Sequence, residues 1–159
     1  MGLRGAGSEE GLGLLPVRTV FMRSKVARPA RAVVNGGFWL DEIRGAQVGG
    51  YEIHVGDTGL VDDGASAPFS ILEGNGPRPD GAFGLGGRVF GSYLHGLGDD
   101  PLFRRALLNH LRRLRGLPEL SGKALSGRAM RERRYDALAD FLEERLRLDL
   151  VEEAVFRDG

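Results

Sequence analysis

Glycine divides this chain into two parts of different character. The 159 residues include 26 glycines, which are concentrated before Gly98, whereas the sequence beyond it is rich in Leu, Arg, Glu and Ala. Glycine and proline interrupt regular elements, and an uninterrupted run of strong helix formers favours helices. The chain is therefore expected to form one domain over residues 1–159, with a strand-rich N-terminal two-thirds followed by two C-terminal helices. This pattern fits an α/β fold, and an α+β fold remains open.

The first part contains short apolar runs separated by turn-forming residues, a pattern that predicts strands. The predicted strands are residues 15–21, 32–34, 51–55, 69–72 and 89–94. Asn35-Gly36 and Asp80-Gly81 are predicted turns, because both residue types tolerate a positive φ. The glycine-rich segment 84–87 lacks the third glycine of a dinucleotide-binding motif and leads into a strand, so it is also predicted to be a tight turn.

The second part predicts two helices. Asp99 and Asp100 precede Pro101, which is typical of a carboxylate N-cap with proline in the first turn. Apolar residues then recur at steps of three and four until Gly116 and Pro118 end the pattern. A second helix is expected to begin near Ser126, with one apolar stripe formed by Tyr135, Leu138, Leu142, Leu146 and Leu150.

Charge and composition exclude several kinds of protein. The 22 basic residues are balanced by 22 acidic residues, which argues against a nucleic-acid or anionic-membrane surface. No apolar run approaches the roughly 18 residues that span a bilayer, so a cytoplasmic location is expected. The sequence contains no cysteine, which excludes disulfides, thiolate metal sites and thiol catalysis by this chain alone.

Three histidines are the remaining candidates for chemistry. Their spacing matches no helical metal-binding pair, and His110 falls on the apolar side of a predicted helix, where a core-edge histidine bonded to a backbone carbonyl is expected. His54 and His95 each end a strand-like run and are soon followed by glycine. Either could act as a general acid or base at neutral pH. Ser66 lacks the glycine pattern of a catalytic serine and is predicted to lie in a loop.

Several segments resemble one known family. Residues 50–58 read GYEIHVGDT, residues 68–69 read PF, and residues 91–97 read GSYLHGL. The likeness extends to EGLGLLPV at residues 10–17, FRRALLN at 103–109 and YDALAD at 135–140. In this order the segments closely resemble the glutamine amidotransferase domain of the cobyric acid synthase family. The related cobyrinate diamide synthases have a different strand motif at the first histidine.

The resemblance implies a class I amidotransferase domain with a flavodoxin-like α/β fold. In such domains a cysteine attacks the glutamine side-chain amide, and a histidine takes the thiol proton and returns it to the leaving ammonia. His95 matches that histidine. The ammonia would pass to an ATP-dependent synthetase domain, which amidates the corrinoid adenosylcobyrinic acid a,c-diamide during cobalamin biosynthesis. ATP and Mg²⁺ are implied for that absent domain, and this chain is expected to bind no cofactor or metal itself.

The resemblance also suggests residues for substrate binding. Tyr51, Glu52, His54 and Tyr93 are expected to help bind glutamine or to face the synthetase domain. Many class I amidotransferases carry a glutamate two residues after the catalytic histidine, but Leu97 stands there in this chain. A third member of the catalytic site would therefore be Glu52 or a residue outside the chain.

The absence of cysteine makes the chain resemble an incomplete amidotransferase domain that lacks the nucleophile-bearing segment. Such a fragment is expected to be inactive alone and to require a longer polypeptide or a partner chain. An uncovered sheet edge and uncovered strand faces would favour self-association or a partner. The alternative is a non-catalytic binding or regulatory module that kept the amidotransferase scaffold.

Overall fold

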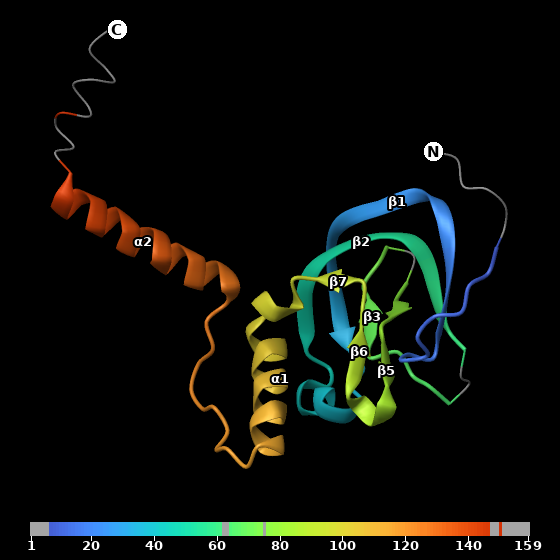
Figure 1. Ribbon diagram of the computed structural model, residues 1–159. Coiled ribbons are helices and arrows are strands. Elements are labelled where there is room, and N and C mark those ends of the chain that lie inside the picture. Colours follow the sequence, from blue (N-terminus) through green and yellow to red (C-terminus); the bar gives the residue numbers. More distant parts are fainter. Residues whose placement is uncertain (1–6, 62–63, 75, 147–149, 151–159) are drawn as a thin grey trace, which may run out of the picture. The chain divides into compact units, whose positions relative to one another are not determined.

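The computed structural model describes residues 7–61, 64–74, 76–146 and 150. The chain divides into two units, Met1–Gly122 and Lys123–Gly159, which are described separately. The first unit contains a five-stranded sheet of order β4-β3-β1-β2-β7 and a two-stranded sheet of β5 and β6 (Figure 1). Its strands are β1 (Val17–Val34), β2 (Gln47–Leu60), β3 (Phe69–Ile71), β4 (Arg78–Asp80), β5 (Ala82–Gly84), β6 (Val89–Gly91) and β7 (Leu94–His95). Its helices are η1 (Phe38–Ile43), η2 (Leu85–Gly87), η3 (Leu97–Asp99) and α1 (Pro101–Leu114).

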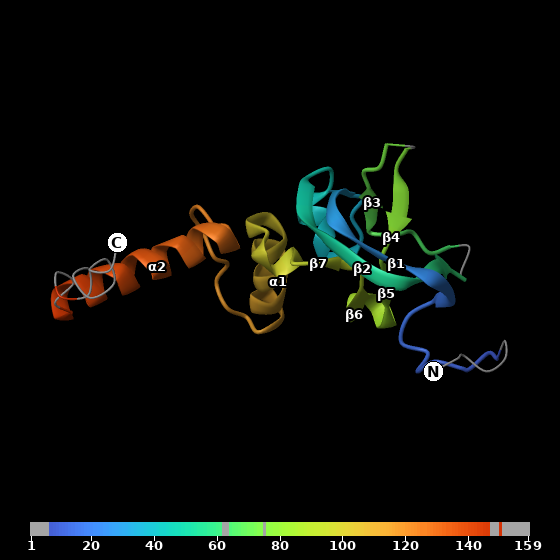
Figure 2. The ribbon, with the colours of Figure 1, turned by 90° about the horizontal axis from the view of Figure 1, so that it is seen from above.

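A long ribbon of β1 and β2 forms the centre of the larger sheet (Figures 1 and 2). The two strands pair antiparallel from Val17 opposite Leu60 to Val33 opposite Gln47, with a register shift between Phe21 and Val26. The two strands predicted at residues 15–21 and 32–34 were therefore wrongly separated, because they belong to one strand. Arginine, lysine and proline interrupt the apolar pattern between them, and pairing with β2 supplies the order that local sequence does not show.

All strand pairs among the described residues are antiparallel. The strand-rich first part and the C-terminal helices agree with the prediction. The described strands do not themselves form the parallel sheet of a flavodoxin-like fold.

The predicted strand at residues 89–94 is divided between the two sheets. Val89–Gly91 pairs with β5, whereas Leu94 and His95 pair with β2. The Asp80 carboxylate accepts hydrogen bonds from the Ser92 hydroxyl at 2.5 Å and from the Tyr93 backbone N–H at 3.2 Å. These bonds hold the chain where it leaves one sheet for the other. The distant partner Asp80 therefore explains a break that the local sequence does not predict.

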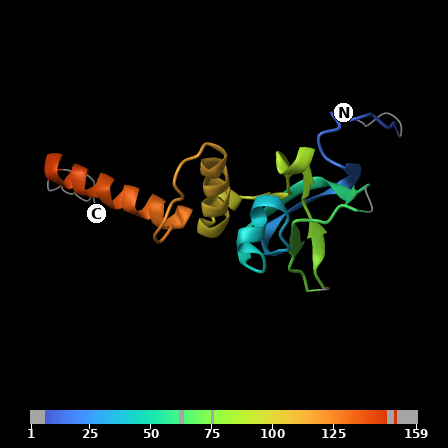
Figure 3. The same ribbon diagram turned by 90° about the horizontal axis from the view of Figure 1, so that it is seen from below.

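The core packs between the large sheet, η1 and α1, which lies beside η1 (Figure 3). Trp39 from η1 is at its aromatic centre and makes edge contacts with Phe83, Phe90 and Phe103, whose ring centroids lie 5.3–5.9 Å away. His110 packs at the margin of this cluster, stacked on Trp39 at 6.3 Å.

Helix α1 begins where the sequence predicts. The Asp100 carboxylate accepts hydrogen bonds from the backbone N–H groups of Leu102 at 2.9 Å and Phe103 at 3.1 Å, and Pro101 follows the cap directly. These bonds satisfy donors that have no partner within the helix. The helix ends at Leu114, before Gly116 with its φ of 62°.

The second unit contains helix α2 (Gly127–Arg145), capped by the Ser126 hydroxyl. Its predicted start is confirmed. Tyr135, Leu138 and Leu142 of the predicted stripe lie in the helix, whereas Leu146 is its C-cap and Leu150 lies beyond its end. No helix in the described ranges is long and apolar enough to cross a membrane.

Candidate functional site

His95 lies at the exposed end of the edge strand β7. It pairs with Tyr51 of β2, and the two rings are stacked with centroids 5.3 Å apart and an interplanar angle of 12°. Directly opposite residues of paired strands project their side chains from the same face of a sheet. Tyr51 therefore restricts one side of the imidazole while the other parts of the ring remain accessible.

Two glycines shape the backbone next to the Tyr51–His95 pair, one by its lack of a Cβ and the other by its positive φ. A Cβ atom at Gly50 would collide with the backbone carbonyl oxygen of His95. Gly96 has a φ of 81°, and a Cβ there would lie 3.5 Å from the Tyr51 ring. Gly50 thus permits the close approach of β7 to β2, and Gly96 permits the left-handed backbone directly after His95.

Gly50→Ala is expected to push β7 away from β2 and to destabilise the first unit by about 1–3 kcal/mol, the usual cost of overpacking. Gly49→Ala is the matched control, because a Cβ at Gly49 meets nothing within 4 Å. Urea unfolding of both variants measures the difference. Equal stability of the two variants would show that the approach of β7 is not constrained by Gly50.

The outer face of β2 is apolar and exposed beside His95. We define it as Tyr51, Ile53 and Val55, whose exposed fractions are 46%, 39% and 42%. Alternate residues of a strand face opposite sides of a sheet. The exposed histidine and the outer face of β2 therefore share one side of the sheet.

Glu52 points to the other side of β2 and is fully buried. Its carboxylate accepts a hydrogen bond from Arg28 Nε at 3.1 Å and another from Arg78. Both arginines also bind Glu73, Arg78 through Nε at 3.0 Å. We call Arg28, Glu52, Glu73 and Arg78 the charge network. Because Glu52 makes its bonds within this network and faces away from His95, it does not orient the His95 ring.

Electrostatics within the charge network favour the charged forms of Glu73 and Arg78. The hydrogen bond from Arg78 is the main cause that lowers the pKa of Glu73 from its usual 4.5, against the opposing effect of burial. Burial opposes the charge of Arg78, but the hydrogen bonds to Glu52 and Glu73 outweigh it and raise the pKa of the guanidinium.

The lowered pKa of Glu73 predicts a loss of stability in acid. The folded state binds this proton less readily than the unfolded state, so the stabilisation is present above pH 4.5 and disappears as the pH falls through the lower folded value. Urea unfolding between pH 6 and pH 3 should show this decline. Glu73→Gln should flatten the curve over that range, and an unchanged slope in that variant would contradict the assignment.

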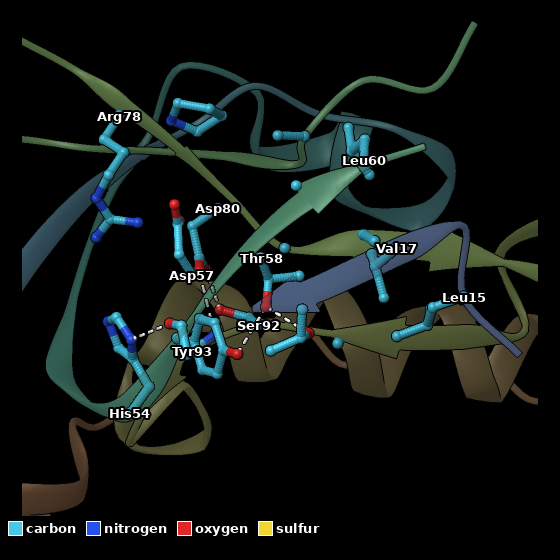
Figure 4. Close-up of a pocket in the computed structure, with 18 residues that line it drawn as sticks. Leu15, Val17, His54, Asp57, Thr58, Leu60, Arg78, Asp80, Ser92 and Tyr93 are labelled. Carbon is cyan, nitrogen blue, oxygen red and sulfur yellow. Dashed lines mark hydrogen bonds between the residues drawn. The ribbon is translucent and has the colours of Figure 1, made fainter. Parts of the chain in front are cut away.

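His54 and Tyr93 meet at a cavity of about 370 Å³ (Figure 4). Their rings are stacked with centroids 4.3 Å apart. By strand alternation His54 lies on the same face of β2 as Glu52. The Tyr93 hydroxyl is 2.7 Å from the Thr58 hydroxyl, and His54 Nδ1 donates to the Gly56 carbonyl oxygen at 2.7 Å. Asp80 and Arg78 also line this cavity.

The residues singled out in the sequence thus fall into two places. Tyr51 and His95 come together on one face of the sheet, whereas Glu52, His54 and Tyr93 lie on the other. The sequence analysis did not identify Arg28, Arg78 or Asp80 as site residues. Leu97, at the position where many class I enzymes carry glutamate, is a buried core residue 6% exposed. Among the described residues there is no group of three or more His, Asp or Glu side chains that could hold a metal ion.

Comparison with known families identifies the class of this domain. Residues 2–103 match the CobB/CobQ-like glutamine amidotransferase domain, and the chain belongs to that family.

Curated relatives that match the chain are cobyric acid synthases. The enzyme of Streptococcus sanguinis strain SK36 is 38% identical over 152 residues, which cover 93% of this chain and 28% of the relative. The Klebsiella pneumoniae strain 342 enzyme is 38% identical over 92% of this chain and 29% of the relative. The Moorella thermoacetica enzyme is 41% identical over 82% of this chain and 25% of the relative. The chain therefore spans little more than a quarter of the length of these relatives. No solved structure matches it.

Proposed function

We propose that this chain is the histidine-bearing part of the glutamine amidotransferase domain of a cobyric acid synthase. The observation that carries the proposal is the exposed His95 on β7, stacked on Tyr51, in a chain similar to cobyric acid synthases over most of its length. Ammonia from glutamine would serve the ATP-dependent amidation of adenosylcobyrinic acid a,c-diamide. ATP, Mg²⁺ and the corrinoid belong, in this proposal, to the synthetase part of the longer enzymes.

His95 acts in this proposal as the general base and acid. Its imidazole takes the proton of a cysteine thiol, and the thiolate attacks the side-chain carbonyl carbon of glutamine. The same proton is then delivered to the leaving nitrogen, which departs as ammonia and leaves a glutamyl thioester for water to hydrolyse. The stacked Tyr51 restricts the ring to the orientation in which its exposed edge can serve both transfers.

The nucleophile must come from polypeptide outside this chain, because the sequence contains no cysteine. The outer face of β2 supports a docking place for that polypeptide, since its exposed apolar residues lie on the same side of the sheet as His95. The exposed edge of β7 lies next to it. We propose that the external polypeptide supplies the parallel strands of a flavodoxin-like sheet at this edge, and that Tyr51 also contacts glutamine.

A chimera tests the proposed function. This chain replaces the matching quarter of the Moorella thermoacetica enzyme, and ammonia release from glutamine is measured. The chimera is expected to hydrolyse glutamine, whereas the 159-residue chain alone is expected to show only background activity. Synthetase activity with added ammonium chloride confirms that the chimera is folded. Glutamine hydrolysis by the isolated chain, if abolished by His95→Ala, would contradict the proposed external nucleophile.

A second candidate is a non-catalytic module that binds a partner through the outer face of β2. The lack of cysteine, together with the exposed Tyr51, Ile53 and Val55, favours it. This candidate predicts a chimera that folds, uses added ammonia and fails to hydrolyse glutamine. It also predicts a stable, cooperatively melting isolated chain, which sedimentation and calorimetry would detect.

A further inference from the structure

We propose that the cavity between β2, β4 and the segment leading into β7 binds a primary ammonium group carried on an apolar body, with Asp80 as its anchor. The cavity is distinct from the proposed glutamine site, because His54, Thr58 and Leu60, which line it, alternate along β2 with Tyr51, Ile53 and Val55 on the face that carries His95. The inference therefore does not depend on the proposed function.

Asp80 supplies the charge. The residue is 5% exposed, and its carboxylate accepts hydrogen bonds from the Ser92 hydroxyl and the Tyr93 backbone N–H. Both donors are neutral, and Asp80 has no ion pair within the part of the chain that the structure describes. A buried carboxylate without a cation is costly, and a positively charged ligand group would remove that cost.

Arg78 also lines the cavity but is already neutralised. Its guanidinium binds Glu52 and Glu73, and Arg28 binds the same two carboxylates. The charge network therefore contains two acids and two bases and has no net charge. Asp80 and the exposed Asp57 remain as the unbalanced charges of the cavity wall.

The neighbouring polar atoms also accept hydrogen bonds. His54 Nδ1 donates to the Gly56 carbonyl oxygen, and Nε2 lies 3.6 Å from Glu52 Oε1. This Nε2 atom is buried and has no hydrogen-bond partner among the described residues. Thr58 and Tyr93 add two hydroxyl oxygens (Figure 4). A group with several N–H donors suits this wall better than a carboxylate does.

The opposite wall of the cavity is apolar, so the part of the ligand that contacts it should be apolar as well. On the side away from Arg78 this wall is formed by Leu15, Val17 and Leu60 (Figure 4), and Pro79 and Ala82 are further apolar residues of the cavity lining. A cavity of about 370 Å³ is much larger than a free ammonium ion and falls within the usual range of small-molecule sites. An alkyl or similar apolar body next to the ammonium group would pack against this wall and fill the cavity.

The proposal is tested by NMR titration of the ¹⁵N-labelled full chain with n-pentylamine. At neutral pH this amine is protonated and carries a primary ammonium group on a five-carbon chain. Amide shifts are expected at Asp80, Ser92, Tyr93 and Thr58, with a Kd of about 1–10 mM for so small a probe. n-Pentanol and pentanoate, which have similar bodies without the cation, should bind at least ten-fold more weakly. Ammonium chloride should also bind at least ten-fold more weakly, because it lacks the apolar body.

Variants identify the anchor. Asp80→Asn should weaken pentylammonium binding at least ten-fold and more than Asp57→Asn does, whereas the control Asp140→Asn, exposed on α2 and outside the cavity lining, should leave it unchanged. Equal binding of pentanol and pentylammonium to the unmodified chain would overturn the proposal, even if Asp80→Asn failed to fold. If ammonium chloride bound as tightly as pentylammonium, the apolar body would not contribute to binding. If Asp57→Asn had a larger effect than Asp80→Asn, Asp80 would not be the anchor.

Discussion

Replacing His95 by asparagine in the chimera is expected to lower glutamine-dependent turnover by about 10³–10⁴-fold, because removing a catalytic acid–base group has effects of this size. Asparagine keeps a polar side chain of similar length but cannot take the thiol proton at neutral pH. The exposed position of His95 at the end of β7 means that the substitution leaves the core intact. Turnover with ammonium chloride should therefore remain within about two-fold, since that reaction bypasses glutamine hydrolysis.

The matched control for this experiment is His110→Asn. His110 is partly buried and packs against Trp39, away from β7. This variant should retain glutamine-dependent turnover at a temperature where it is folded. A similar loss in His95→Asn and His110→Asn, or a loss of ammonia-dependent turnover in His95→Asn, would assign His95 a structural role instead of a catalytic one.

The sequence predicted best what short-range chemistry determines. Asp100 before Pro101 and Ser126 before Gly127 are capping residues, and both helices begin there in the structure. Such caps depend on atoms within three residues of one another. The interruption predicted at Asp80-Gly81 also has a local cause, because β4 ends at Asp80 and Gly81 has a φ of 84°.

Long-range contacts were not predictable in this way. The alternation of residues 51–55 indicated a strand, but nothing near Glu52 shows that its side chain would be fully buried. Its partners Arg28 and Arg78 lie 24 and 26 residues away and are brought to it by β1 and β4. The cavity likewise joins residues of β1, β2 and β4 with Ser92 and Tyr93 before β7, so its polar wall depends on the sheet topology.

Removing Arg78 tests how the fold tolerates the buried carboxylate of Glu52. Arg78→Met is expected to destabilise the first unit by about 2–3 kcal/mol, because it leaves that fully buried charge with Arg28 as its remaining strong partner. This is below the 3–5 kcal/mol for breaking a fully buried pair, since both arginines are partly exposed to solvent. Glu52→Gln should cost only about 1 kcal/mol, because it removes the charge itself and both arginines keep Glu73.

The double variant separates a buried-charge effect from a packing effect. If the cost of Arg78→Met comes from the uncompensated Glu52 carboxylate, then Glu52→Gln introduced into Arg78→Met should restore part of the lost stability. Arg128→Met is the control, because its pair with Glu132 is exposed on α2 and its loss should produce no measurable change. Strict additivity of Arg78→Met and Glu52→Gln in urea unfolding would contradict this account, and would mean that Arg78 contributes to stability independently of the Glu52 charge.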